Sequence, residues 1–321
     1  MSDFPHKNPV FLLPLIFLFW FSISFSAQPA QVRIDRGDSL TAIASHLKET
    51  GLIRSTSLFK IYSLITGAAH RFKPGIYSFY GNEGLARIIT TLMKGPSLVE
   101  VVVTEGLTLK DIDHKLSELA VIKKGELINY FLKGDDYWFL KDRSSLEGFL
   151  FPDTYKFSPG TDVGLVVKTM IDNFDAKAAP LLSKKNDWYN ILILASLLEK
   201  EVSLSQDRLL VADILQRRLK IGMPLQVDAT VTYLKCDGEY LFCNNRQLIK
   251  SDFKIDSPYN SYLYKGLPPS PIANPGLAAI SAVLNPKKNS YLFYLTDPRT
   301  KKTVFSKTFD DHDDQRAKHL R

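Results

Sequence analysis

The chain has 321 residues, which is long enough for two domains of ordinary size. Its 45% hydrophobic and 12% aromatic content excludes a mostly disordered protein. Lys and Arg number 41 against 34 acidic residues, and this net charge of +7 suits an anionic partner such as a membrane surface or an acidic polymer. The basic residues are scattered and accompany no nucleic-acid-binding motif, so we expect no nucleic-acid partner.

Residues 9–27 form an uncharged apolar run. Its length of about 18 residues suits a single membrane-spanning helix. Lys7 precedes the run and the next Lys or Arg is Arg33, so residues 1–8 are expected in the cytoplasm. A cleaved signal peptide is the alternative, because Ser24 and Ser26 are small residues near its end. Either interpretation places the rest of the chain outside the cytoplasm. We expect a single-pass protein of the inner (plasma) membrane with a periplasmic or extracytoplasmic catalytic domain.

Residues 31–104 read as one small α+β unit. A strand at 32–34 leads to a helix at 40–50, which Asp38 or Ser39 caps and Gly51 ends. A second helix is predicted at 57–66, followed by a strand within 73–79, a helix at 85–94 and a strand at 98–104. The apolar residues that indicate the second helix recur at helical spacing: Leu58, Ile61, Tyr62 and Ile65.

Residues 105–321 read as a larger mixed α+β catalytic domain. Helices are predicted at 109–119 and 124–132. A third helix, with Asp187 as its cap, runs up to residue 201, and a fourth at 205–220 ends at Gly222. A turn-rich, aromatic segment lies at 146–155. Beyond Gly222 we expect short strands and loops, beginning with 225–233 and including a proline-rich loop at 266–273.

Cys236 and Cys243 flank the six residues DGEYLF. In an oxidising compartment the two thiols would close a local disulfide, and two free thiols are the alternative. Neither cysteine has a nearby histidine, so a zinc site is not expected.

Acid–base chemistry by carboxylates is the remaining catalytic option, because the six histidines lack metal-ligand spacing and no phosphate loop or nucleophile elbow occurs. We therefore expect neither a metal nor a cofactor. The apolar helix ILILASLLEKE, residues 191–201, ends in Glu199 and Glu201. Glu201 falls on the side of Leu194, Leu197 and Leu198, where loss of hydration would raise its pKa and suit it to act as a general acid.

Five motifs in order resemble those of the endolytic murein transglycosylase family, the YceG-like proteins. They are EGFLFPDTY at 147–155, ASLLEKE at 195–201, LQVDATVTY at 225–233, YNSY at 259–262 and GLPPSPI at 266–272. The resemblance makes the second glutamate of the EKE element, Glu201, the catalytic residue. Val202 departs from the family, whose members often carry a hydroxyl residue there. The N-terminal unit resembles a LysM module, which binds N-acetylglucosamine-containing glycans, through RGDSL at 36–40 and Ile43-Ala44.

The resemblance implies non-hydrolytic cleavage of the β-1,4 bond between N-acetylmuramic acid and N-acetylglucosamine in nascent strands. Protonated Glu201 would protonate the glycosidic oxygen and then take the proton of the muramic C6 hydroxyl, whose attack on C1 closes a 1,6-anhydro ring. Ordinary glycosidases need two carboxylates, whereas here the substrate supplies the nucleophile. The implied partners are peptidoglycan strands, the membrane and penicillin-binding protein synthases, and the implied role is termination of strand elongation.

Supporting roles are assigned more loosely, and each residue has an equally good structural interpretation. The candidates for binding sugar hydroxyls and acetamides are Gln226, Asp228, Thr230, Tyr233, Tyr259 and Asn260. Those for a sugar-facing wall are Phe149, Phe151 and Tyr155, while Glu147 and Asp153 are expected to bind substrate or to satisfy backbone amides. Glu199 is expected to matter less than Glu201. A non-catalytic peptidoglycan-binding scaffold and a lysozyme-type muramidase are the two alternative functions.

Overall fold

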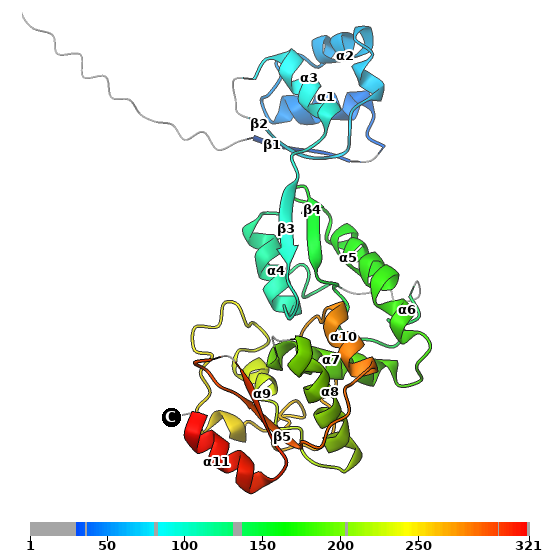
Figure 1. The fold of residues 1–321 in the computed structure, drawn as a ribbon. Helices are drawn as coiled ribbons and strands as arrows, with labels where there is room; N and C mark the ends of the chain where they lie inside the picture. The colour runs from blue at the N-terminus through cyan, green and yellow to red at the C-terminus, as the bar shows by residue number, and fades with distance from the viewer. Residues whose placement is uncertain are drawn as a thin grey trace, which may run out of the picture.

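The computed structural model describes residues 30–319 except 36, 80–82, 131–136, 203–204 and 301. The expected cytoplasmic segment 1–8 and anchor 9–27 lie outside the described residues. Within the part that is described, no helix combines the length and the apolar character needed to cross a membrane. Figure 1 shows an elongated molecule: a small N-terminal unit, a middle region around β3 and β4, and a larger C-terminal region follow one another.

The N-terminal unit has the strand–helix–helix–strand order predicted from the sequence. Its elements are β1 (Ala30–Ile34), α1 (Leu40–Glu49), α2 (Thr56–Ile65), a 3-10 turn η1 (Ala68–His70), β2 (Gly75–Phe79) and α3 (Leu85–Lys94). β1 pairs antiparallel with β2, and Val32 lies opposite Tyr77. Ser39 caps α1 as predicted, since its hydroxyl accepts from the amide of Ala42, and Gly51 at φ +74° follows the last turn.

The helix predicted at 57–66 is confirmed as α2. Phe59 and Ser63 are its buried residues, and Phe59 stacks on Phe72 with ring centroids 5.7 Å apart. The residues that recur at helical spacing, which are Leu58, Ile61, Tyr62 and Ile65, are all exposed. α2 is apolar around most of its circumference, so periodicity alone does not determine which side packs on the unit.

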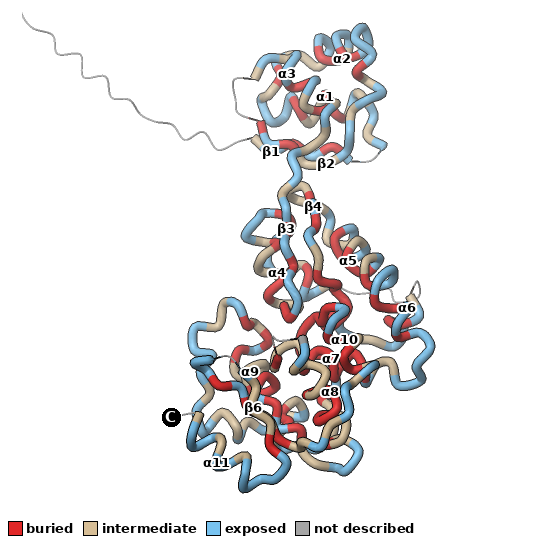
Figure 2. The backbone as a smooth tube through the Cα atoms, in the orientation of Figure 1, coloured by how far each residue is buried: buried red, intermediate tan, exposed pale blue. Residues whose placement is uncertain are grey.

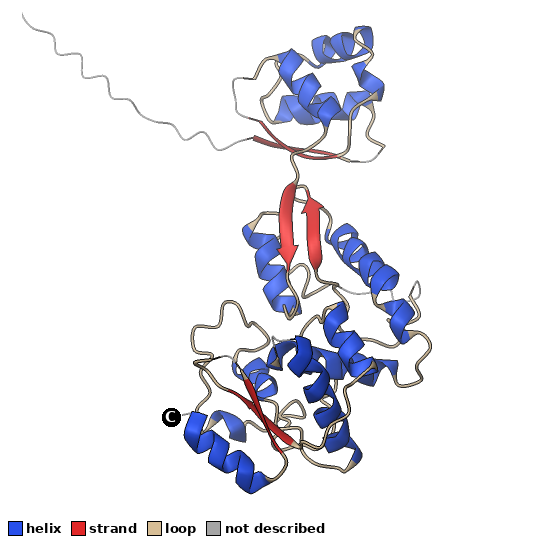
Figure 3. Ribbon diagram, viewed as in Figure 1, coloured by secondary structure: helices blue, strands red, loops and turns tan. Residues whose placement is uncertain are grey.

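The middle region is built on β3 (Val99–Val103) and β4 (Asp153–Phe157), which pair antiparallel with Val101 opposite Tyr155. α4 (Leu109–Glu118) and α5 (Val163–Lys177) lie beside this pair (Figure 3). The strand at 98–104 therefore joins the second hydrophobic core, and the boundary between the cores falls between Leu92 and Val101. Residues 124–130, predicted as the start of a helix, form turns instead.

The N-terminal unit also touches the turn that follows β4. Gly160 adopts φ +68°, and a Cβ placed there would lie 2.0 Å from Cδ1 of Ile76 in β2. The backbone of this turn therefore packs directly against the first unit, and only glycine leaves room for the contact.

The C-terminal region surrounds a buried helix. Its elements are α6 (Ala179–Leu182), α7 (Trp188–Glu201), α8 (Ser205–Lys220), α9 (Asp228–Lys235), a 3-10 turn η3 (Asp252–Lys254), α10 (Leu277–Leu284), β5 (Phe293–Thr296), β6 (Thr303–Ser306) and α11 (Phe309–His319). α7 packs on α8, α9 and α10, and this part of the molecule is the most continuously buried in Figure 2. β5 and β6 pair antiparallel. Across the described residues, three two-stranded sheets and the helices make the predicted α+β fold.

Residues 225–233 were predicted to begin a region of strands and loops, and this was wrong for their second half. α9 begins at Asp228, although Val231 and the threonines of this segment favour strands by propensity. Burial of one face, with Ala229, Thr230 and Val231 inside, outweighs that preference. The disulfide prediction is confirmed, because Cys236 and Cys243 are bonded at the C-terminal end of α9.

A buried polar junction ties three distant segments together. The side-chain oxygen of Asn274 accepts from the amide of Leu150 at 2.9 Å, and its nitrogen donates to the carbonyl of Leu107 at 2.9 Å and to Glu147 at 3.3 Å. Both backbone groups of Asn274 are paired as well, with Leu107 and Gly106. The proline-rich loop is thereby fixed to the start of α4 and to the segment before β4.

Replacing Asn274 with Ala should lower the free energy of unfolding by about 2–4 kcal/mol, because it leaves the buried amide of Leu150 and the carbonyl of Leu107 without their partner. Urea unfolding monitored by circular dichroism measures the change. Asn285→Ala is the matched control, since Asn285 is exposed and its amide makes one 3.4 Å bond to a helix carbonyl. Equal stability of the two variants would contradict the assignment of a structural junction.

Candidate active site

α7 brings a carboxylate to the edge of the core because its sequence is apolar until its last turn. Eight consecutive residues, 191–198, are buried, and the helix ends at Glu201 where Val202 turns to an extended conformation. Asp187 occupies the N-cap position as predicted, although its side chain makes no capping hydrogen bond. The packing of α7 therefore fixes where Glu201 lies.

Glu201 is held by groups from two other elements. The amide of Ala229, in the first turn of α9, donates to Oε1 at 3.4 Å. The hydroxyl of Tyr294 in β5 donates to Oε2 at 3.1 Å. Segments more than 90 residues apart in sequence thus meet at one carboxyl group.

The environment of Glu201 raises its pKa from 4.5 to about 7. Loss of hydration is the largest cause, and the negative charge of Asp228 adds to it. The hydrogen bonds from Ala229 and Tyr294 and the charge of Arg218 act in the opposite direction. Glu201 as a whole residue is half-buried, and a pKa of about 7 places its carboxyl group near half-protonation at neutral pH. These are the properties of a general acid that later acts as a base.

Glu201 lies in a pocket of about 660 Å³ between α7, α8, α9, β5 and α11. The lining residues are Lys200, Glu201, Arg218, Gln226, Asp228, Lys250, Phe253, Tyr262, Phe293, Tyr294, Leu295, Thr296, Phe309, His312 and Arg316. They combine aromatic rings with both acidic and basic groups, a composition that suits an amphipathic, polyhydroxylated ligand.

Two of the predicted sugar-binding residues line this pocket. Asp228 is exposed at the start of α9, and its Oδ1 accepts a hydrogen bond from the hydroxyl of Tyr262. Gln226 is exposed and adopts φ +52°, a left-handed conformation that few residues other than glycine take. Backbone strain of this kind concentrates at functional sites, because the surrounding structure must hold it.

Arg218 supplies a fixed positive charge on the other side of the pocket. Its guanidinium donates to the carbonyls of Leu292 at 2.8 Å and Leu225 at 2.6 Å, and it lies 5.3 Å from the ring centroid of Phe293. These contacts join α8, the start of the α9 segment and β5. Burial lowers the pKa of Arg218 from its ordinary value, and the nearby charge of Glu201 counteracts this.

Glu199 and Glu147 are structural in this protein. The Glu199 side chain is 6% exposed, and it pairs with Arg208 at 3.0 Å and accepts from the amide of Gly276 at 3.0 Å. Glu147 is buried, and both its oxygens accept from the amide of Leu109 at the start of α4. Burial raises the pKa of Glu147 to about 8. Glu147 thus satisfies a backbone amide, which was one of the two predicted roles.

The predicted sugar-facing wall lies outside the pocket. Phe149, Phe151 and Tyr155 are buried in the core of the middle region, where Phe149 packs edge-on against Phe174. Asp153, on β4, pairs with Lys177 at 2.6 Å, which lowers its pKa to about 2. These residues build the middle region and do not face Glu201.

The other four candidates, Thr230, Tyr233, Tyr259 and Asn260, are not among the residues that line the pocket. Thr230 and Asn260 are fully buried, and Asn260 donates to the carbonyls of Phe253 and Ile255. Tyr233 packs against Tyr259, whose hydroxyl is 2.6 Å from that of Ser270. They hold together the 225–233, 259–262 and 266–272 motifs, so the motifs cluster in space even where single side chains do not reach the pocket.

Sequence reasoning missed Arg218, Tyr262 and Tyr294 as residues of the site. Tyr262 belongs to the YNSY motif at 259–262, and this motif was the only sequence feature that pointed to any of the three residues. Arg218 lies in α8 and Tyr294 in the short strand β5, and no motif marks either position.

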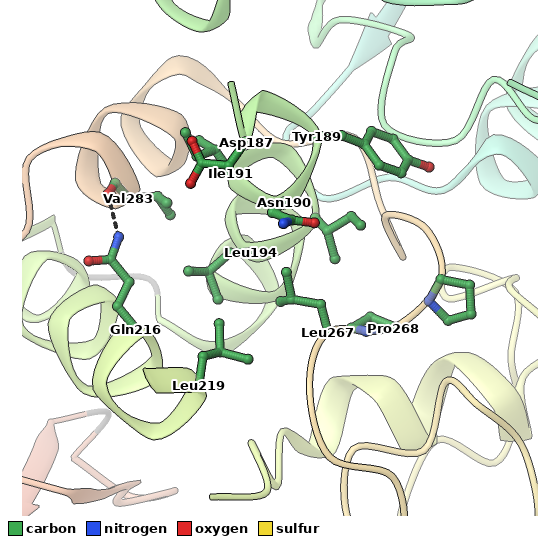
Figure 4. A pocket seen from close by; sticks show the side chains of 12 residues that line it. Asp187, Tyr189, Asn190, Ile191, Leu194, Gln216, Leu219, Leu267, Pro268 and Val283 are labelled. Carbon is green, nitrogen blue, oxygen red and sulfur yellow. Dashed lines mark hydrogen bonds between the residues drawn. The ribbon is translucent and has the colours of Figure 1, made fainter. Parts of the chain in front are cut away.

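A second pocket of about 690 Å³ lies at the other end of α7. Figure 4 shows Asn190 and Leu194 of α7 facing Leu219 of α8 and the proline-rich loop at Leu267 and Pro268. Gln216 is turned away to donate to the carbonyl of Val283 at 2.7 Å. Across the described ranges, no group of three or more His, Cys, Asp or Glu side chains is arranged to hold a metal ion in either pocket or elsewhere.

Comparison with known proteins places this chain in a family. A profile of the YceG-like family matches residues 32–318. The chain therefore belongs to the YceG-like family.

Individual relatives extend the comparison. An endolytic murein transglycosylase of Bacillus subtilis is 33% identical over 320 residues, covering 92% of this chain and 86% of that protein. An endolytic murein transglycosylase of Streptococcus pneumoniae is 29% identical over 90% of this chain, which spans 58% of the pneumococcal protein. A crystal structure of a yceG-like protein from Listeria monocytogenes is similar with a TM-score of 0.57 and 27% identity, covering 90% of this chain and all of that one.

Glu201→Gln should stabilise the protein above neutral pH. The pKa of Glu201 is about 7 in the folded chain and 4.5 ordinarily. The folded state therefore loses stability relative to the unfolded state as the pH rises from 4.5 towards and beyond 7. Gln cannot ionise, and the variant should gain about 1–3 kcal/mol in the free energy of unfolding near pH 8 and almost nothing near pH 4. Urea unfolding at both pH values measures the difference.

Glu199→Gln is the matched comparison, two residues away on the same helix. It removes the charge paired with Arg208, so we expect a loss of about 3 kcal/mol at neutral pH. Stabilisation by both substitutions, or by neither, would show that the two carboxyl groups do not differ in the way described.

Proposed function

We propose that this chain is an endolytic murein transglycosylase that cleaves the β-1,4 bond between N-acetylmuramic acid and N-acetylglucosamine within nascent glycan strands. The single observation that carries the proposal is Glu201, a carboxyl group held at a pKa of about 7 in a pocket lined by aromatic and charged side chains. Family membership and the names of the relatives supply the substrate class.

The reaction needs one group that first gives and then takes a proton. Protonated Glu201 donates to the glycosidic oxygen while the C1–O bond breaks and positive charge develops on the muramic ring. The resulting carboxylate then accepts the proton of the muramic C6 hydroxyl while the oxygen of that hydroxyl bonds to C1. The products are a 1,6-anhydro muramic end and a free 4-hydroxyl, with no net uptake of water.

Neighbouring residues have defined roles in this scheme. Asp228 raises the pKa of Glu201, and its negative charge favours the developing positive charge on the sugar. Tyr294 orients the carboxyl group through its hydroxyl, while Gln226 presents an amide to the substrate from the pocket rim. Arg218 limits how far the pKa of Glu201 rises.

The setting in the cell is part of the proposal. The apolar segment 9–27 would anchor the chain in the inner membrane, with the catalytic region outside the cytoplasm. The N-terminal unit would hold glycan as LysM-like modules do, and a penicillin-binding protein synthase would deliver the strand. A cut in a strand that is still being extended would end its elongation.

Glu201→Gln should abolish formation of anhydro-ended fragments from isolated glycan strands, because Gln can neither donate nor accept the required proton. Mass spectrometry of the digest identifies the products: fragments without added water support the lyase, and fragments that gain water indicate a muramidase. Glu199→Gln, assayed at a temperature where it is folded, should retain activity. Unchanged cleavage by Glu201→Gln would overturn the assignment, and a wild-type chain that pellets with sacculi without cutting them would support the scaffold alternative.

The pH dependence of the reaction should respond in opposite directions to two substitutions. Because the protonated acid is required, the rate should fall as the pH rises through about 7. Tyr294→Phe removes a hydrogen bond that lowers the pKa of Glu201, so the fall should move to higher pH. Asp228→Asn removes a charge that raises this pKa, so the fall should move to lower pH. Rate profiles on the same glycan measure both, and a shift of the two in one direction would contradict the assigned titration.

A further inference from the structure

The N-terminal unit exposes an apolar helix face that its own core does not use. Five residues of α2 form this surface, the α2 apolar face, with exposed fractions of 64% for Leu58, 54% for Ile61, 41% for Tyr62, 59% for Leu64 and 80% for Ile65. At 100° per residue these five positions cover a continuous arc of about 160°. Soluble proteins seldom leave such a contiguous apolar surface uncovered without a binding purpose.

The sequence segment that contains α2 carries charge of one sign. Residues 50–82 contain no Asp or Glu, and the flanking acids in the sequence are Glu49 and Glu83. The same stretch carries four basic side chains and a histidine: Arg54, Lys60, Arg71, Lys73 and His70. Arg54 immediately precedes the N-cap of α2 and is exposed, and Lys60 lies at the edge of the apolar arc.

This combination favours a lipid surface over a protein partner. A helix that lies in the membrane interface has a wide apolar face bordered by Lys and Arg, and each basic residue near an anionic leaflet contributes favourably. A typical protein interface has a polar rim, whereas the charged side chains that the segment 50–82 supplies are all basic. Tyr62 within the arc is a residue type enriched at membrane–water interfaces.

The position of α2 in the molecule agrees with such a contact. Figure 1 places α2 at the end of the molecule farthest from the C-terminal region, and Figure 2 shows its surface as mostly exposed. The apolar segment 9–27 also directly precedes this unit in the sequence, so a membrane that held the segment would lie beside it.

We propose that the α2 apolar face and its basic border dock the N-terminal unit onto the surface of an anionic lipid membrane. The helix lies in the plane of the interface, its aliphatic side chains enter the headgroup layer, and Arg54 and Lys60 contact lipid phosphates. This contact is independent of the reaction at Glu201, so either proposal can fail without the other.

Vesicle flotation of a chain that begins at residue 30 tests the proposal without the preceding apolar segment. Both hydrophobic cores lie within residues 32–283, so this chain keeps every core residue described. It should float with vesicles of phosphatidylglycerol and phosphatidylcholine, much less with phosphatidylcholine alone, and less at high salt. Arg54→Gln should weaken binding about fivefold, and the double substitution Ile61→Asp with Ile65→Asp should abolish it.

The control is Leu165→Asp in α5, which changes a residue of similar exposure, 57%, far from α2 in the sequence. It should bind vesicles as the unaltered chain does, and thermal unfolding should show that all variants remain folded. Absence of flotation, equal binding to neutral vesicles, or full binding by the double variant would overturn the proposal. Lipid-free dimers that the double variant loses, seen by sedimentation, would assign the face to a second copy of the chain instead.

Discussion

The carboxyl group of Glu201 depends on a compromise between burial and hydrogen bonding. Burial alone would keep it protonated, and it could not return to the carboxylate form that accepts a proton. The amide of Ala229 and the hydroxyl of Tyr294 favour the charged form enough to bring the pKa to about 7. Each of these groups lies on a different element, so the fold of the whole C-terminal region sets the chemistry of one side chain.

Much of the remaining structure serves to hold α7 in place. Glu199 fixes the last turn of α7 to α8 through Arg208 and to the N-cap of α10 through Gly276. Asn274, two residues before Gly276, joins the same segment to Glu147 and the start of α4. The two glutamates at the end of α7 therefore differ: Glu199 is paired with Arg208 and Gly276, whereas the pKa of Glu201 allows it to gain and lose a proton near neutral pH.

The sequence allowed most of the helices and the acidic residue at the end of α7 to be predicted, because apolar periodicity, caps and glycine ends act locally. Gln226 and Asp228, which were predicted to bind sugar, line the pocket that contains Glu201. Arg218 and Tyr294 could not be found in this way, since only tertiary packing brings α8 and β5 to the helix end. The error at α9 has a related cause: strand propensity does not reveal which neighbours an element meets.

Gly160 allows the turn after β4 to contact the N-terminal unit directly. Because its backbone abuts Ile76 without an intervening side chain, the small unit rests on the β4 turn as well as on the connecting chain. The length of the β3–β4 arm then sets the separation between α2 and the Glu201 pocket. If α2 lies on a membrane surface, the protein acts as a spacer. Its length then sets how far from that membrane a growing glycan strand is cut.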